Sequence, residues 1–240
     1  METDKEAKTT LIEIIESARR SNLSYTDFFL IFIESYNHKV RAQLNVRRDV
    51  VEDIVAKIRK LANIVARSRD TLINLSQRTL QLKSQGYQPF LVDCLGLPEV
   101  YEIYKRVTEA CGVLSIAIEP YVNVTALTYS FRDAFRALSM PELAKILGTS
   151  LYRGIDLVMH NELSNPLELD TLVRLVDARL KVYADDLARD AINKHRTFIV
   201  SDHGYDNYHE NNRYYLGHGE KPKLAKIAPL IIVNCDILIK

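Results

Sequence analysis

With 240 residues, 47% of them hydrophobic, the chain is long enough for one sizeable core, or for one core and a small accessory domain. Its 32 Lys and Arg residues balance 31 Asp and Glu residues, and the formal net charge of +1 excludes a strong overall attraction to nucleic acid or membranes. No apolar run approaches the roughly 18 residues that span a bilayer, and the 3 cysteines include no C-x-x-C pair. We therefore expect a soluble cytoplasmic protein without a disulfide framework or a thiolate zinc site.

The first part of the chain, up to Gly86, contains neither Gly nor Pro, the two residues that interrupt regular structure most strongly. It predicts helices over 4–20 and 25–42, the second beginning after a Ser24 or Thr26 cap. Apolar residues then recur every three or four positions over 51–82, which predicts one long helix with a heptad seam. We expect this coiled-coil-like helix to pack on the earlier helices or on a second subunit.

The pattern changes after Pro89, where short apolar runs alternate with amphipathic stretches, as they do in βαβ units. The predicted strands cover 90–92, 113–118, 155–159, 197–200 and 230–233, and predicted helices cover 98–111 and 167–194. The sequence thus predicts an α/β domain over 87–240, with a mostly parallel sheet and helices on both faces. An all-helical N-terminal region over 1–86 precedes it.

Polar residues with metal-binding or nucleophilic groups follow three of the apolar runs. Asp93 follows 90–92, Thr125 follows 121–124, and Asp202 and His203 follow 198–201. Ligands of parallel sheets bind at the carboxyl ends of the strands, so these side chains should meet there. Asp and neutral His are ordinary zinc ligands, and a Thr hydroxyl held against the ion loses its proton more easily. Each residue alone also fits a turn or a helix cap, but together they predict a metal site with Thr125 as nucleophile.

The same segments resemble the alkaline phosphatase superfamily, and within it the PglZ-like branch, over roughly residues 88–240. The resemblance lies in LVDCLG at 91–96, NVTALT at 123–128, SDHGY at 201–205, YLGHG at 215–219 and IAPLIIV at 227–233. It implies an alkaline phosphatase-like fold and one or two divalent ions, with zinc the expected metal. It also implies Asp93, Asp202, His203 and His218 as ligands and Thr125 as nucleophile, with Thr128 the less favoured attacker.

One element departs from the family pattern. After a strand such as 155–159, the family supplies an Asp and, four residues on, a His or acidic residue for the second ion. The resemblance puts Ser164 and Glu168 at these places. The second ion is then expected to rest on His218, Glu168 and His160, and to be held weakly because the Ser164 side chain carries no charge.

Three functional hypotheses follow. The first is a metal-dependent phosphodiesterase that acts on phosphate esters or nucleotide-like substrates. The second is a catalytically weak or inactive phosphatase-like binding module, which acts in a larger assembly or as a homo-oligomer through its N-terminal helices. The third is a nucleic-acid-binding protein, because basic side chains outnumber acidic ones over 41–83, although a solvated helix face explains that excess as well. The loop residue His209 is expected to face solvent.

Overall fold

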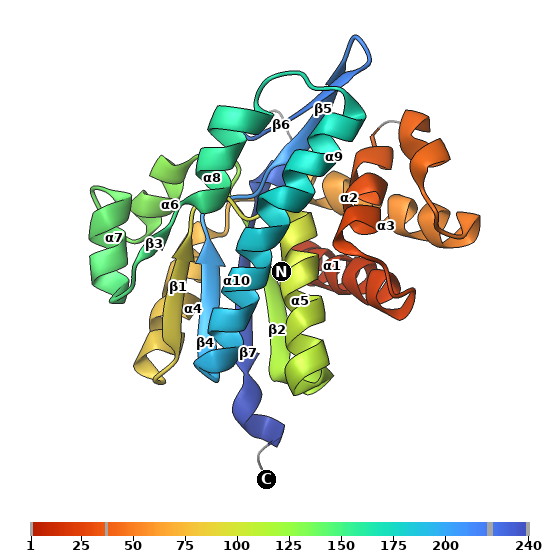
Figure 1. The fold of residues 1–240 in the computed structure, drawn as a ribbon. Helices are drawn as coiled ribbons and strands as arrows, with labels where there is room; N and C mark the ends of the chain where they lie inside the picture. Colours follow the sequence, from red (N-terminus) through yellow and green to blue (C-terminus); the bar gives the residue numbers. More distant parts are fainter. Residues whose placement is uncertain (1, 37, 220–222, 239–240) are drawn as a thin grey trace.

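The computed structural model describes residues 2–36, 38–219 and 223–238. A five-stranded sheet in the order β2-β7-β4-β1-β3 lies at the centre of the molecule (Figure 1). Its strands are β1 (Gln88–Val92), β2 (Ile116–Val122), β3 (Leu151–Tyr152), β4 (Arg196–Ser201) and β7 (Ile227–Asn234). Strand β1 pairs in parallel with β3 and β4, whereas β7 runs antiparallel to β4 and β2. The predicted α/β class is confirmed, and β7 makes the mostly parallel sheet a mixed one.

Helices cover both faces of this sheet, because side chains of a strand alternate between its faces. In β4, Phe198 and Val200 lie in a core with residues of α4, α6 and α7, whereas Ile199 lies in a core with residues of α1, α5 and α10. Figure 1 shows α5 and α10 in front of the sheet and α4 behind it. The α-helices are α1 (Glu2–Arg20), α2 (Tyr25–Glu34), α3 (Arg48–Arg67), α4 (Leu72–Ser84), α5 (Leu97–Cys111), α6 (Thr128–Ala134), α7 (Met140–Leu147), α8 (Gly154–Val158), α9 (Leu169–Ala178) and α10 (Leu180–Asn193).

The predicted long helix over 51–82 is wrong, because it is divided into α3 and α4. Between them, the Thr71 hydroxyl accepts a hydrogen bond from the Val122 N–H at 2.7 Å, and the Thr71 N–H donates to the Val122 carbonyl at 2.9 Å. These bonds tie the connection to the end of β2. The apolar residues of α3 and α4 consequently enter different cores, and the seam is not continuous. One core holds residues of α1, α3, α5 and the sheet. The division into regions 1–86 and 87–240 therefore stays a prediction.

Other elements also differ from those predicted. The second helix, α2, is capped by Ser24, which forms a capping box with Asp27, but it ends at Glu34 and a 3₁₀ helix follows. The predicted strand at 155–159 is helical, and the predicted helix over 167–194 is divided into α9 and α10. A hairpin of β5 (Asp206–Glu210) and β6 (Arg213–Gly217) forms in a stretch expected to be a loop. The short helices are His38–Gln43, Val113–Ser115, the π-helix Met159–Leu163, Leu224–Lys226 and Cys235–Leu238.

A disulfide joins Cys111, at the end of α5, to Cys235, just after β7, with their Cα atoms 5.3 Å apart. This bond corrects the expectation of reduced cysteines. The expectation rested on the odd cysteine count, but Cys94 is the buried free cysteine and the other two are paired. Among the residues described, no helix has the length and apolar character needed to cross a membrane.

Candidate metal centre

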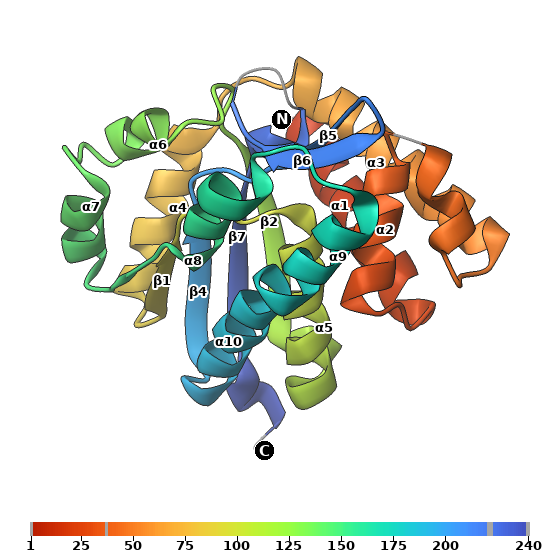
Figure 2. The same ribbon diagram turned by 45° about the horizontal axis from the view of Figure 1, so that its top comes forward.

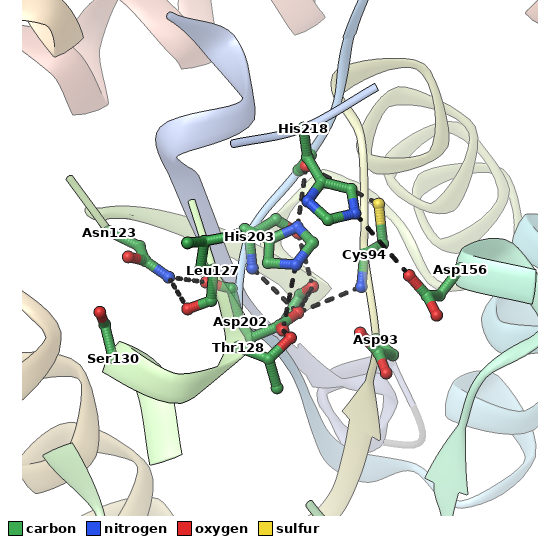
Figure 3. Close-up of polar contacts among 12 residues, drawn as sticks. Asp93, Cys94, Asn123, Leu127, Thr128, Ser130, Asp156, Asp202, His203 and His218 are labelled. Carbon is green, nitrogen blue, oxygen red and sulfur yellow. Dashed lines mark hydrogen bonds and ion pairs between the residues drawn. The ribbon is translucent and has the colours of Figure 1, made fainter. Parts of the chain in front are cut away.

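The carboxyl ends of β1 and β4 bring together a first group of ligands, Asp93, Asp202 and His203. All three side chains are buried, and each offers a ligand atom within 4.8 Å of the others. The loops that carry them are bonded to each other, since the Cys94 N–H donates to Asp202 Oδ1 at 3.1 Å and the Leu95 N–H donates to the His203 carbonyl at 2.9 Å. Figure 3 shows these side chains converging. The predicted convergence of Asp93, Asp202 and His203 is confirmed.

His203 is oriented as a metal-binding histidine would be. Its Nδ1 lies 2.9 Å from the Gly204 carbonyl, an arrangement that places the ring proton on Nδ1 and leaves a lone pair on Nε2. That Nε2 atom is buried, lies 3.3 Å from Asp202 Oδ2, and has no hydrogen-bond partner among the described residues. A buried nitrogen lone pair beside two carboxylates fits a bound cation.

The turn that carries His203 is anchored from behind. The Tyr205 hydroxyl donates to Glu99 Oε1 at 2.8 Å, and the Gly96 N–H donates to Glu99 Oε2 at 3.1 Å. A Cβ atom at Gly96 would lie 2.2 Å from the Tyr205 ring, so only glycine allows this approach. The motifs LVDCLG and SDHGY therefore pack against each other, in addition to supplying the side chains of one candidate metal site.

A second group of ligands, Asp156, His160 and His218, lies beside the first. Asp156 and His160 stand one helical turn apart where α8 continues into the π-helix, with 3.2 Å between His160 Nε2 and Asp156 Oδ1. His218 follows β6, and its Nε2 lies 3.2 Å from His160 Nε2. The His218 ring also stacks on the His203 ring, with the centroids 4.3 Å apart, and this contact joins the two groups.

Of the residues expected to hold the second ion, the structure brings His218 and His160 together with Asp156, but not Glu168. Glu168 lies outside both groups and forms an ion pair with Arg213 at 3.3 Å. Ser164 donates its hydroxyl to the His160 carbonyl at 2.8 Å. The error came from reading 155–159 as a strand, which moved the expected ligand pair eight residues downstream. Asp156 supplies the carboxylate that the second site was expected to lack.

The hydroxyl that contacts the first group belongs to Thr128 rather than to Thr125, the expected nucleophile. Thr128 Oγ1 donates to Asp202 Oδ2 at 2.7 Å. Thr125 Oγ1 instead bonds to Asn123 Oδ1 at 2.8 Å and lies 2.9 Å from Ser130 Oγ. Both threonines occur in NVTALT, and residue types alone do not separate them.

Burial and like charges perturb the titration of the centre. Burial, followed by the nearby Asp202 and Asp156, raises the pKa of Asp93 to about 7. Burial, followed by His203 and His160, lowers the pKa of His218 to about 4. The Arg153 guanidinium lies near one carboxylate of each group, with Nε 3.7 Å from Asp93 Oδ2 and Nη2 3.9 Å from Asp156 Oδ2. Crowded carboxylates and neutral imidazoles together favour binding of cations.

An open pocket of about 320 Å³ gives solvent access to the centre. Thr128, Asp93, Asp156 and His218 line it, together with Arg132 and Arg153. Candidate metal ligands, a hydroxyl and two guanidinium groups thus border one space, which suits an anionic substrate.

His209, expected to face solvent, lies on β5 with its ring centroid 4.8 Å from that of Tyr214.

Comparisons with protein-family models, curated proteins and solved structures gave no significant match to this chain.

Proposed function

We propose that this chain is a metal-dependent hydrolase of phosphate esters, with Thr128 as its nucleophile. The main support is the position of the Thr128 hydroxyl, which is hydrogen-bonded to a ligand of the first group and borders the pocket that the second group lines. The resemblance to the alkaline phosphatase superfamily supports the same proposal. With Asp156 and His160 in place of Ser164 and Glu168, every position of the family pattern has a suitable residue in the expected order.

The donor set fits divalent ions and suits zinc in particular. Each group combines carboxylate and imidazole donors, which are common zinc ligands. The unpartnered Nε2 of His203 and the raised pKa of Asp93 show that the first group is incompletely satisfied by the chain itself. Ions bound here would lower the pKa of the Thr128 hydroxyl and offset negative charge on the phosphoryl oxygens.

The chain's own residues then account for the positions of the reacting groups. Asp202 holds Thr128 Oγ1 by a hydrogen bond and accepts its proton as the oxygen attacks phosphorus. The new bond joins Thr128 Oγ1 to phosphorus while the ester P–O bond breaks, and the departing alcohol takes a proton from water. Water then attacks the phosphothreonine, the bond to Thr128 Oγ1 breaks, and Thr128 regains a proton. Arg132 and Arg153 border the space in which the anion would lie.

The rival hypothesis of an inactive binding module loses its main argument, because that argument was the missing carboxylate at Ser164. A phosphodiester or nucleotide-like substrate stays the expected class. For the nucleic-acid hypothesis, the described part of the chain offers no comparable cluster of converging side chains. Several basic residues of its expected surface are paired with acidic ones, including Arg48 with Glu52 and Lys57 with Asp53.

Paired threonine variants test the proposal. Zinc-loaded protein should hydrolyse bis(p-nitrophenyl) phosphate, and Thr128→Ala should lower kcat at least about 1,000-fold, as loss of a nucleophile does elsewhere. Thr125→Ala is the matched control and should keep activity within about tenfold, because Thr125 bonds to Asn123 and Ser130 rather than to the ligands. Full activity in Thr128→Ala, or a larger loss in Thr125→Ala, would refute the assignment.

A further inference from the structure

A larger pocket of about 560 Å³ adjoins the candidate metal centre. It lies between β3, α8 and α10, and both ribbon views show α8 next to α10 (Figures 1 and 2). Leu151 and Arg153 line this second pocket and the pocket of the metal centre alike. The two spaces are therefore neighbours with a shared wall.

Apolar and aromatic side chains form much of the second pocket. Tyr183 and Leu187 stand one turn apart on α10, and Leu157 faces them from α8. Leu157 is 48% exposed and Tyr183 is 38% exposed, so the chain leaves apolar surface uncovered inside a concavity. The Tyr183 ring lies against the backbone of Gly154, where an added Cβ would be 2.3 Å from a ring carbon. The absence of a side chain at Gly154 thus allows the Tyr183 ring to form one wall of the pocket.

The charges of the second pocket balance. Its described lining has two guanidinium groups, on Arg153 and Arg189, and two carboxylates, on Asp186 and Asp190. Arg189 is paired with Asp186, and Asp190 accepts a hydrogen bond from the Tyr152 hydroxyl at 3.2 Å. This pocket has no excess charge to attract a second phosphate, whereas bound ions would add positive charge to the pocket of the metal centre. A neutral occupant matches it best.

We propose that the second pocket binds a neutral aromatic or apolar ester group of the substrate while the phosphoryl group lies at the metal centre. This inference rests on the proposed function and narrows its substrate class. The volume of about 560 Å³ lies within the roughly 300–1,000 Å³ typical of small-molecule sites and is large enough for an aromatic group. The preferred substrate is then a phosphate ester with a bulky neutral group, rather than a small alkyl ester.

Equilibrium binding of two diesters separates the contributions of the two pockets. Zinc-loaded Thr128→Ala, which cannot turn substrate over by the proposed route, is titrated calorimetrically with dimethyl phosphate and with diphenyl phosphate. Both are monoanions and differ in their neutral groups. We expect diphenyl phosphate to bind roughly tenfold or more tightly, from burial of the ring. Adding Tyr183→Ala or Leu157→Asn should reduce this ratio below about threefold while leaving dimethyl phosphate affinity unchanged. Val182→Ala alters an exposed neighbour outside the described pocket lining and should keep the ratio.

The outcomes separate a failure of the second-pocket inference from a failure of the proposed function. Equal affinity for the two esters, or a ratio that survives both pocket variants, overturns the inference about the second pocket and leaves the proposed function standing. Failure of zinc-loaded protein to bind either ester counts against the proposed function, and the inference falls with it. Should Tyr183→Ala unfold, Leu157→Asn still decides, because Leu157 is half exposed and tolerates a polar replacement.

Discussion

Asp206 is expected to make the stability of the fold depend on pH. Its carboxylate accepts hydrogen bonds from the Tyr36 hydroxyl and from the Leu224 N–H, each at 3.1 Å. It pairs with Gly217 across the hairpin, directly before the candidate ligand His218. Burial raises the pKa of Asp206 from 3.8 to about 6, and hydrogen bonds from Leu224, Asn207 and Tyr36 offset part of that rise.

The size and sign of the effect follow from this pKa. A rise from 3.8 to about 6 is about 2 units, or roughly 3 kcal/mol at 1.36 kcal/mol per unit. The folded chain holds this proton more tightly than the unfolded chain does. The contribution of Asp206 to the free energy of unfolding is therefore largest below pH 3.8, falls as the pH rises from about 4 to 6, and levels off above that range. Asp206→Asn removes this dependence, and its loss of one acceptor adds a separate, pH-independent cost of about 1–2 kcal/mol.

Urea unfolding of metal-free protein between pH 3.5 and 7 measures the prediction. The difference in unfolding free energy between wild type and Asp206→Asn should shift by about 3 kcal/mol in favour of the variant across this range. Contributions of other titrating groups cancel in that difference, provided that they do not contact Asp206. Tyr36→Phe removes a hydrogen bond that lowers the pKa and should steepen the dependence. Parallel curves for wild type and Asp206→Asn would show that the reasoning is wrong.

Two further predictions concern the second ion and the disulfide. Asp156→Asn should weaken one of two zinc equivalents about 100-fold or more in a chelator competition titration, since it removes the anionic ligand of its group. Ser164→Asp should leave both affinities unchanged, and tighter binding in that variant would restore the ligand assignment made from the sequence. Cys111→Ser should lower the free energy of unfolding by about 3–5 kcal/mol, because the disulfide spans 124 residues. Adding a reductant should lower the free energy of unfolding of the wild type by a similar amount. A Cys111→Ser variant as stable as the oxidised wild type would contradict this prediction.

The sequence predicted those parts of the centre that follow regular strands. Asp93, Asp202 and His203 each come directly after an apolar run that is a buried strand, and the carboxyl ends of such strands meet at one edge. Helix and strand could not be told apart over 155–159, because a short apolar run fits either. The helix that begins at Gly154 turns Asp156 and His160 into neighbours on one face, a relation that a strand would have prevented.

The divided seam has a similar cause. Apolar spacing continues unbroken from α3 into α4, and no Gly or Pro lies between them. The helix nevertheless ends because the side chains of Asp70 and Thr71 bond to backbone groups of Leu72, Val122 and Val124. The bonds to Val122 and Val124 compete with helical ones only when the end of β2 is already nearby. The local sequence shows that Asp70 and Thr71 can bond to backbone groups, but it does not show that the end of β2 lies beside them.

The sequence also could not show which of two threonines contacts the candidate ligands. Thr125 and Thr128 are equivalent by residue type, and both lie near the start of a helix. Ala126 has a positive φ of 49°, and Asn123 Nδ2 donates to the carbonyls of both Leu127 and Asp202, so the turn is fixed against the loop that carries the ligands. This turn directs Thr128 toward Asp202 and leaves Thr125 on Asn123. In the proposed mechanism a hydroxyl three residues away cannot substitute, because attack needs its oxygen at the candidate ligands and not merely on the same segment.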